Sequence, residues 1–405
     1  MRIAFITYEF PPDTGKGGIG TYVKQAANSL SCMRCDVHVF AGSNNRTGSV
    51  LTDGYWVHWL QCSDGNNFRD KVVISFTAQQ AIAAFDLIES PEINGNAWEI
   101  KKAFRDIPLV VRLHAPNYLV ESLKKKYIPL TAKLRFVLGA VRRLKWDAGY
   151  WRTYKKETDP DYRFIQLANA ITAPSEAMKD WVVKYWKMPA EKIKVIPNIF
   201  IPPPSLLQIP IYEESRYKRT VFFGRLNVLK GLVNATRAMK KILTEHPDWQ
   251  FRVIGDDGSG PHAGITMRDW MKKKLRSVIN QVEFMDGMNY DAIPTAIRDT
   301  EIVLLPSLFE SFSYTCIESM AAGKAIVGSN NGGMSDLLQN GESGLLIDPE
   351  NYQDIYAAIK RLVQNNELRY SIAVKTRERV LKDFNATAPA EKLIAYYQHL
   401  IDAAK

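Results

Sequence analysis

Two glutamates, Glu310 and Glu318, have the spacing and setting of ligand-binding residues. Glu310 lies in a polar loop directly after the apolar run Ile302–Leu305, which predicts a buried parallel strand. Because open α/β sheets bind ligands at the carboxyl ends of their strands, we expect Glu310 on the ligand side. Ser313 or Thr315 can cap the next helix, and Glu318 follows about one turn inside it, near N–H groups that attract anions. Glu318 is equally consistent with a capping box, Thr315-x-x-Glu318, that only closes the helix.

Two cations, Arg225 and Lys230, follow the predicted strand Thr220–Phe223 and leave the sheet on the same side as Glu310. Together they can neutralise a diphosphate leaving group, because a guanidinium grips an oxyanion through two hydrogen bonds and an ammonium adds a point charge. Preorganised charge of this kind is often the largest single contribution to catalysis. Spacing alone favours the alternative that both are surface cations at the start of a helix.

The run Gly15–Gly20 satisfies G-x-G-x-x-G, with a predicted strand before it and a helix after it. A nicotinamide-dependent dehydrogenase is therefore an alternative. Residues 11–14 separate the strand from the first glycine, whereas a dinucleotide fold places that glycine at the turn itself. The acid that binds ribose should end the second strand, but Asp36 precedes that strand and residues 41–44 contain no acid. Both features count against the dehydrogenase.

Strands and helices alternate along the chain, which predicts an α/β protein with doubly wound parallel sheets. Pro197–Pro204 divides it, because prolines do not fit inside a sheet and stiffen a linker. We expect a first domain over residues 1–200 and a second over 201–385, with a ligand cleft between them. The predicted strands of the first half are Arg2–Phe10, Val37–Phe40, Trp56–Leu60, Asp86–Glu89, Leu109–Leu113, Ala170–Ala173 and Lys194–Ile196. Those of the second half are Thr220–Phe223, Gln250–Ile254, Val282–Met285, Ile302–Leu305 and Ala325–Val327.

The stretch Ser307–Ser313, together with Glu318, resembles the E-x7-E signature of retaining glycosyltransferases of family 4. Gly224–Gly231 resembles the G-R…K-G motif of the same family. The resemblance implies the GT-B fold, in which two Rossmann-like domains with doubly wound parallel sheets face each other across a cleft. It also implies that a C-terminal helix, residues 386–405, crosses back to the N-terminal, acceptor-side domain, while the second domain binds the nucleotide sugar.

Carried over position by position, the resemblance places Glu310 beside the donor sugar, Glu318 at the ribose hydroxyls, and Arg225 and Lys230 at the donor phosphates. Serines replace two glycines of the family signature, which alters contacts to the donor. The catalytic residues so implied are Glu310, His114, Arg225 and Lys230. The donor-binding residues so implied are Gly17, Gly18, Arg225, Lys230, Glu310, Ser311, Phe312, Ser313, Tyr314, Thr315 and Glu318.

In the first half, Gly17 and Gly18 match a Gly-Gly loop that approaches the donor phosphates in the family. His114 ends a predicted strand at a position where the family often has a histidine near the donor sugar and the acceptor. Asn198 matches a Pro-Asn-Gly turn, but Ile199 replaces the glycine. That difference favours a hinge role for Asn198 over contact with substrate.

The resemblance thus implies a hexosyltransferase that retains anomeric configuration. The expected donor is a nucleotide diphosphate sugar, UDP-glucose before GDP-mannose, and the expected acceptor is a hydroxyl of a saccharide or lipid-linked molecule in polysaccharide or glycolipid synthesis. We expect no metal and no cofactor, because cationic side chains neutralise the leaving phosphate. The alternatives are a sugar-nucleotide epimerase with the same fold, the NAD-dependent dehydrogenase and a basic nucleic-acid binder. The last ranks lowest, because aromatic residues do not interleave with the basic run as stacking platforms would.

Composition sets further bounds. The chain has 405 residues, 46% hydrophobic and 24% charged, which is enough for two globular domains. We expect a cytoplasmic protein, because no apolar run reaches the roughly 20 residues of a membrane span and no basic segment precedes the first strand. Cys32-x-x-Cys35 has no second cysteine pair, so we interpret it as coincidental. Asp159-Pro160-Asp161 has no apolar strand before it and predicts a surface turn rather than a metal site.

The formal net charge of +10 is concentrated in residues 121–156, which hold 11 Lys or Arg against 2 Asp or Glu. A helical pattern over Pro129–Trp146 gives an apolar stripe, which predicts a helix packed on its own domain. The alternative is a helix that lies on an anionic membrane surface, at the inner face of the membrane.

Overall fold

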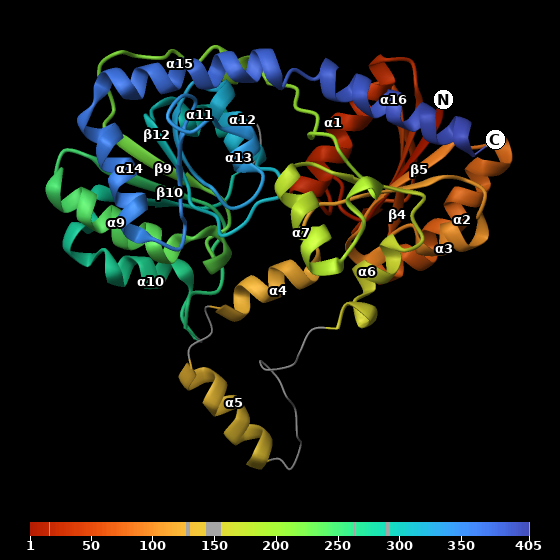
Figure 1. Cartoon of the computed structure of the whole chain (residues 1–405), viewed down its shortest axis with the longest axis horizontal. Coiled ribbons are helices and arrows are strands. Elements are labelled where there is room, and N and C mark those ends of the chain that lie inside the picture. The colour runs from red at the N-terminus through yellow and green to blue at the C-terminus, as the bar shows by residue number, and fades with distance from the viewer. Residues whose placement is uncertain (16, 127–129, 143–154, 263, 289–291, 405) are drawn as a thin grey trace. The chain divides into compact units, whose positions relative to one another are not determined.

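The computed structural model describes the chain except residues 16, 127–129, 143–154, 263, 289–291 and 405, and the side chains of 130–132 and 135. The described residues form two compact units (Figure 1). Unit 1 comprises Met1–Asn117, Lys155–Ile201 and Asp383–Lys405, and unit 2 comprises Tyr118–Tyr154 and Pro202–Lys382. The described part of residues 118–154, which lies inside the predicted first domain, therefore groups with unit 2.

Unit 1 contains, among its described residues, an eight-stranded sheet in the order β3-β4-β2-β1-β5-β6-β7-β8. Its strands are β1 (Arg2–Thr7), β2 (Asp36–Ser43), β3 (Gly48–Thr52), β4 (Tyr55–Gln61), β5 (Leu87–Pro91), β6 (Leu109–Arg112), β7 (Ala170–Ala173) and β8 (Ile193–Val195). Neighbours pair in parallel except β3, which is antiparallel to β4. The strand order switches direction between β1 and β5, and doubly wound sheets bind ligands at such a point.

Unit 2 contains a six-stranded sheet in the order β11-β10-β9-β12-β13-β14. Its strands are β9 (Arg219–Phe223), β10 (Gln250–Ile254), β11 (Val282–Met285), β12 (Ile302–Leu305), β13 (Ala325–Ser329) and β14 (Leu345–Ile347). The strand pairs are parallel. Here the order switches direction between β9 and β12, and doubly wound sheets bind ligands beside the loops that follow such a pair of strands. Both units confirm the predicted α/β architecture with doubly wound parallel sheets.

Helices with a buried apolar face cover the sheets. The helices of unit 1 are α1 (Gly18–Cys32), α2 (Gly65–Ile82), α3 (Trp98–Ala103), α6 (Pro160–Ile165), α7 (Glu176–Trp186) and α16 (Thr387–Ala403). The helices of unit 2 are α4 (Asn117–Lys126, whose first residue belongs to unit 1), α5 (Leu130–Arg142), α8 (Pro204–Leu207), α9 (Leu232–Glu245), α10 (Met267–Lys274), α11 (Ile293–Arg298), α12 (Tyr314–Ala321), α13 (Met334–Leu337), α14 (Tyr352–Gln364) and α15 (Asn366–Asp383, whose last residue belongs to unit 1). Over the described ranges, no helix is both long enough and apolar enough to cross a membrane.

The core of unit 2 shows how the helical pattern is used. Ala235, Met239 and Ile242 recur at helical spacing on α9 and are fully buried. They join one apolar cluster with residues of α10, α14 and the sheet. This packing fixes the start of α9 relative to the strands, and with it the loop after β9 that carries Arg225 and Lys230.

Three local predictions need correction. The first strand ends at Thr7 rather than Phe10, because Thr14 folds back: its hydroxyl donates to the Tyr8 carbonyl at 2.6 Å and accepts from the Phe10 N–H at 3.1 Å. The edge strand β3 was not predicted, because four of its five residues are exposed and no alternating pattern marks it. The edge strand β14 was not predicted either, because it has only three residues.

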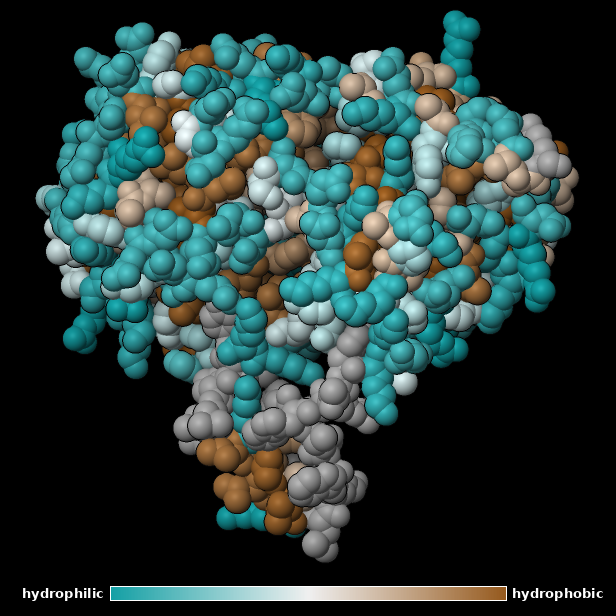
Figure 2. All heavy atoms as spheres, viewed as in Figure 1, coloured by the Kyte–Doolittle hydropathy of each residue, from teal (hydrophilic) through white to brown (hydrophobic). Residues whose placement is uncertain are grey.

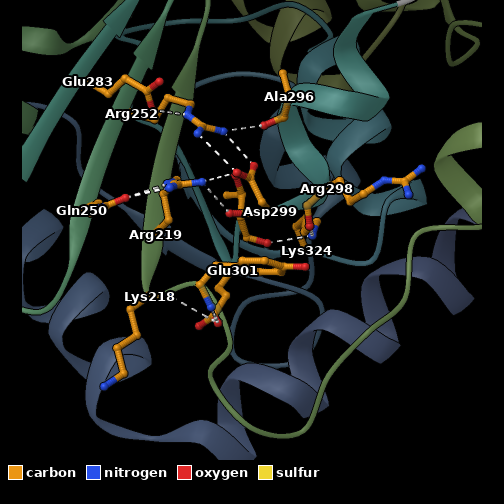
Figure 3. Close-up of polar contacts among 12 residues, drawn as sticks. Lys218, Arg219, Gln250, Arg252, Glu283, Ala296, Arg298, Asp299, Glu301 and Lys324 are labelled. Atoms are coloured by element: carbon orange, nitrogen blue, oxygen red, sulfur yellow. Dashed lines mark hydrogen bonds and ion pairs between the residues drawn. The ribbon is translucent and has the colours of Figure 1, made fainter.

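The amino edge of the unit 2 sheet is closed by a network of charges (Figure 3). Arg219 and Arg252 both form ion pairs with Asp299. Glu301, which precedes β12, accepts hydrogen bonds from backbone N–H groups of the segment before β9 and pairs with Arg369 at 3.2 Å. These groups satisfy one another at the edge opposite to the loops after β9 and β12, so we assign them a structural role.

Candidate functional site

The centre of the candidate site is an ion pair between Lys230 and Glu310. Lys230 ends the 3-10 turn Val228–Lys230 after β9, and Glu310 lies in the loop after β12. The Ser307 hydroxyl donates to the same Glu310 oxygen, Oε1, at 2.9 Å. The side chains of Lys230 and Glu310 are 28% and 20% exposed, so the ion pair is mostly buried but is still in contact with solvent. The structure therefore brings together two residues that lie 80 positions apart in the chain.

Backbone contacts hold these two loops against each other. The Leu308 N–H donates to the Leu229 carbonyl at 2.8 Å. Gly231 has φ +69°, and a Cβ at this position would lie 1.7 Å from the Pro306 carbonyl oxygen. Only glycine permits both the positive φ and this approach. The last glycine of the G-R…K-G motif, Gly231, thus lets the loops after β9 and β12 contact each other.

A third loop supports Glu310 from the other side. The Gly333 N–H donates to the Glu310 carbonyl at 2.6 Å, and Glu310 forms an isolated bridge with Gly332. Gly332 has φ +102°, and a Cβ there would lie 2.2 Å from the Glu310 carbonyl oxygen. The paired glycines after β13 therefore fix the backbone of Glu310 and leave its carboxylate free to face the β9 loop.

Arg225 differs from Lys230 in its surroundings. It follows Gly224, which has φ +141°, and its side chain is exposed. Its guanidinium makes no ion pair with any residue in the described part of the chain. The next residue, Leu226, is fully buried, and its N–H donates to the Asp256 carbonyl at 2.8 Å. Arg225 is thus an exposed cation on an anchored backbone.

The start of α12 settles which residue caps it. Ser313 is the cap, and its hydroxyl oxygen accepts from the Cys316 N–H at 3.2 Å. Thr315 lies inside the helix, so the capping box Thr315-x-x-Glu318 does not form. Glu318 is nevertheless buried, with 4% of its surface exposed. Helix capping therefore does not account for the position of Glu318.

The residues between Glu310 and α12 form a buried polar and aromatic wall. Phe312, Ser313 and Tyr314 are each less than 10% exposed, while Ser311 and Thr315 are half-buried. The rings of Phe312 and Tyr314 meet edge to face with centroids 5.4 Å apart. These residues position the loop, because their side chains pack inward while its backbone stays at the carboxyl edge of the sheet.

In unit 1 the glycine loop lies at the N-terminus of α1. Gly17 is the residue before the helix, has extended backbone angles and provides no side-chain cap. Gly17 and Gly18 are exposed. Solvent therefore reaches the N-terminus of α1, the end of a helix that attracts anions, at these two residues. A Cβ at Gly15 would lie 2.8 Å from the Phe10 nitrogen, so the glycine is needed for the folded turn between β1 and α1.

His114 follows β6 and is buried in unit 1 with 6% of its surface exposed. Burial, with a smaller contribution from the Arg112 charge, lowers the pKa of His114 to about 3. The imidazole is therefore neutral at neutral pH. Its Nε2 has no hydrogen-bond partner among the described residues, and its ring meets that of Tyr22 with centroids 5.5 Å apart. A neutral imidazole with an unpaired nitrogen can bind a hydroxyl group.

The sequence analysis missed Glu92, which holds the backbone of His114. Both Glu92 carboxylate oxygens accept from the His114 N–H at 3.0 Å. Glu92 is fully buried, and burial together with the nearby Asp161 charge raises the pKa of Glu92 to about 8. Its position just beyond β5, at the switch point of the sheet, is the only signal that could have identified it.

Asp159-Pro160-Asp161 is not the predicted surface turn. Asp159 caps α6 by accepting from the Asp161 N–H at 2.9 Å, and Asp161 is fully buried. Asp161 accepts from the N–H groups of Asn94 and Asn117 at 3.3 and 2.8 Å. Burial raises the pKa of Asp161 to about 6. The motif was misread because a D-P-D sequence caps a short helix as readily as it makes a turn.

Asn198 is buried and bonded within unit 1. It is 3% exposed, and its Oδ1 accepts from Arg112 at 2.6 Å. Arg112 also donates to the Ile196 carbonyl at 2.7 Å and lies over the Tyr22 ring. These contacts connect the segment before the proline cluster to β6.

Within the residues that the structure describes, no group of three or more His, Cys, Asp or Glu side chains could hold a metal ion. Cys32 and Cys35 are both free thiols, so the Cys-x-x-Cys spacing forms no disulfide.

Two family models match this chain in sequence. The one described as Glycosyltransferase Family 4 matches residues 16–200, and the one described as Glycosyl transferases group 1 matches residues 209–379. The glycogen synthase of Mycobacterium tuberculosis is 23% identical over 98% of this chain and 95% of that protein.

Solved structures agree with the fold. Sucrose-phosphate synthase from Thermosynechococcus elongatus superposes with a TM-score of 0.73 at 19% identity, covering 99% of each chain. Anabaena HepE in complex with UDP-glucose superposes with a TM-score of 0.68 at 17% identity, covering 98% of this chain and all of that one.

Proposed function

Because the chain belongs to the GT-B glycosyltransferases of family 4, we propose that it is a retaining hexosyltransferase. The donor is a nucleotide diphosphate sugar, with UDP-glucose as the first candidate. The acceptor is a hydroxyl of a saccharide or lipid-linked molecule in polysaccharide or glycolipid synthesis. The sequence matches support a glycosyltransferase. The identity of the donor, the identity of the acceptor and the retention of anomeric configuration are what we propose beyond those matches.

The observation that carries the proposal is the Lys230–Glu310 pair at the switch point of the unit 2 sheet. A carboxylate held by Lys230 and Ser307 can accept hydrogen bonds from sugar hydroxyls. The ammonium of Lys230 and the exposed guanidinium of Arg225 can bind the diphosphate that leaves. The N-terminus of α12, whose cap Ser313 lies three residues beyond Glu310, adds N–H dipoles that favour the same negative charge.

The proposed step is attack from the face that the leaving group occupies. The acceptor oxygen forms a bond to the anomeric carbon as the bond from that carbon to the phosphate oxygen breaks. The acceptor proton passes to the departing phosphate, which serves as the base. Arg225 and Lys230 stabilise the charge that develops on the phosphate, an effect worth several kcal/mol per group in preorganised sites. Glu310 orients the sugar and does not need to take a proton.

A solved structure with the same fold supports UDP-glucose as the donor. The structure of HepE was solved in complex with UDP-glucose, and that protein shares the fold of this chain. We propose that the two cations neutralise the diphosphate without a metal ion. In unit 1, the neutral His114 with its unpaired Nε2 would bind a substrate hydroxyl, and the exposed N–H groups after Gly17 would bind an anion.

The first test is thermal unfolding of the full chain with UDP, GDP, ADP or NAD, each with EDTA or with magnesium. A ligand at 100 times its dissociation constant that binds only the folded state adds about 2.7 kcal/mol, which is readily detected. A shift with one nucleoside diphosphate in EDTA supports the proposal and names the base. A shift with NAD alone refutes it, and a shift that requires magnesium refutes metal independence.

A transfer assay tests the reaction itself. The matching radiolabelled nucleotide sugar is incubated with and without saccharide acceptors, and the product linkage is assigned by NMR. Retention of configuration requires the product to have the same anomeric configuration as the donor. Conversion of the donor sugar without any acceptor identifies the epimerase instead and overturns the transferase.

A further inference from the structure

The helix α5 carries an apolar stripe that the described residues do not cover. Leu134, Leu138 and Val141 are 51%, 62% and 56% exposed. Their spacing of four and three residues places them on one face of the helix. Figure 2 shows the corresponding group of hydrophobic atoms over α5. The predicted packing of this stripe on its own domain is therefore wrong for these three positions.

The helix α9 of the same unit has an apolar stripe of the same spacing, and that stripe is buried. Ala235, Met239 and Ile242 follow the same helical spacing on α9 and are fully buried in the unit 2 core. The apolar face of α9 is thus explained by its own domain. The apolar face of α5 has the same periodicity and lacks such a cover within the described structure, so it is available to something else.

The charge around α5 indicates what kind of partner would cover its apolar face. Residues 121–156 hold 11 Lys or Arg and 2 Asp or Glu. Three consecutive lysines, Lys124–Lys126, end α4 just before α5, and Arg142, the last residue of α5, is exposed. Lys124 pairs with Glu121 at 2.9 Å, and Lys126 pairs with Glu350 at 3.0 Å. Both pairs are solvent-exposed, and such pairs are weak, so they leave the segment basic.

We propose that α5, with the lysines that end α4, binds the surface of bilayers that contain anionic lipid. The stripe of Leu134, Leu138 and Val141 enters the acyl boundary, and the basic residues contact lipid phosphates. An amphipathic helix with an apolar face and basic flanks has this preference. A nucleic acid would use the charges and leave the aliphatic stripe in water. A second copy of this chain would place two basic segments against each other. The bilayer matches both the apolar and the charged features.

The test is sedimentation of the full chain with vesicles at low and high salt. Vesicles of phosphatidylcholine with about a third phosphatidylglycerol should bring down the protein at 50 mM NaCl. Pure phosphatidylcholine vesicles should not, and 500 mM NaCl should release the protein, because charge attracts it first. Failure to sediment with the anionic vesicles at low salt overturns the proposal.

Two matched variants separate the stripe from general surface hydrophobicity. Leu134→Ser/Leu138→Ser should lower the partition coefficient on anionic vesicles at least tenfold, since each leucine contributes several buried methylene groups. Ile74→Ser/Ile82→Ser on α2 removes two residues that are 73% and 75% exposed, without a comparable basic flank. This control should bind vesicles as the unmodified chain does. The proposal is overturned if the α5 variant binds vesicles as tightly as the unmodified chain does, or if the control variant loses as much binding as the α5 variant.

Other occupants of the stripe have their own readouts. Light scattering would detect a dimer of the unmodified chain that becomes a monomer in the α5 variant, and this result would assign the stripe to a second copy. Release from anionic vesicles by duplex DNA, with unchanged DNA binding in the α5 variant, would assign the charges to nucleic acid. Either result overturns the proposal. Nucleotide binding should be unchanged in the α5 variant, which keeps this test separate from that of the transferase.

Discussion

Replacement of Gly231 by alanine should separate the two loops that carry Lys230 and Glu310. The new Cβ would lie 1.7 Å from the Pro306 carbonyl oxygen, whereas real Cβ atoms essentially never come closer than 3.0 Å. The oxygen must therefore move away by 1.3 Å or more. A movement of that size takes the 2.8 Å bond between the Leu308 N–H and the Leu229 carbonyl beyond hydrogen-bonding distance.

The energetic cost has three parts. Alanine at a positive φ costs roughly 1–2 kcal/mol. The lost hydrogen bond adds about 1 kcal/mol. The displacement of packed neighbours adds about 1–3 kcal/mol. Gly231→Ala should therefore lower the free energy of unfolding of unit 2 by roughly 3–6 kcal/mol, given these contributions. Because Lys230 moves with the loop, the affinity for the nucleoside diphosphate should fall about tenfold or more.

Gly341→Ala is the matched control. Gly341 has φ +81°, and a Cβ there would meet no atom within 4 Å. This variant has the backbone strain without the collision, so it should lose only about 1–2 kcal/mol and keep its nucleotide affinity. Urea denaturation followed by circular dichroism measures the stability, and titration calorimetry with UDP measures the affinity. Equal destabilisation of the two variants would refute the contact, and full UDP affinity in Gly231→Ala would refute its role in placing Lys230.

Two further predictions test the charges of the site and of unit 1. Arg225→Ala and Lys230→Ala should each lower kcat/KM for sugar transfer by roughly 10²–10³-fold, with a change of no more than about 1 kcal/mol in the free energy of unfolding; unchanged turnover in both variants would disprove their role. Burial raises the pKa of Glu92 to about 8 from an ordinary value of 4.5, so between these values the folded protein holds a proton that the unfolded chain has lost. The free energy of unfolding should therefore fall as the pH rises from 5 to 8, and by less in Glu92→Gln; parallel pH profiles from urea denaturation would contradict this assignment.

Local pattern was enough to locate five of the six strands that the structure describes in unit 2. The strands Gln250–Ile254, Val282–Met285 and Ile302–Leu305 were predicted with the bounds that the structure gives. Their ends are marked by neighbouring polar residues and glycine. The three-residue edge strand β14 was missed, and in unit 1 the edge strand β3 was missed because four of its five residues are exposed.

The sequence by itself also determined which residues lie at the carboxyl edges of the two sheets. Arg225, Lys230, Glu310 and His114 each come after a strand, and parallel strands bring their carboxyl ends to one side of a sheet. Strand order is a different matter, because it depends on which strands pair. The placement of β9 beside β12, which joins Lys230 to Glu310 across 80 residues, became visible only in the fold.

Burial was the other property that only tertiary structure decided. Glu92 and Asp161 are acidic residues in polar surroundings along the chain, yet the fold buries both and raises the pKa of each. Leu134 and Leu138 belong to a stripe typical of a packed helix, yet the fold leaves them exposed. The periodicity of apolar residues indicates which side chains share a face of a helix, but not what that face contacts. Those contacts are with residues far along the chain, and they form only when the chain folds.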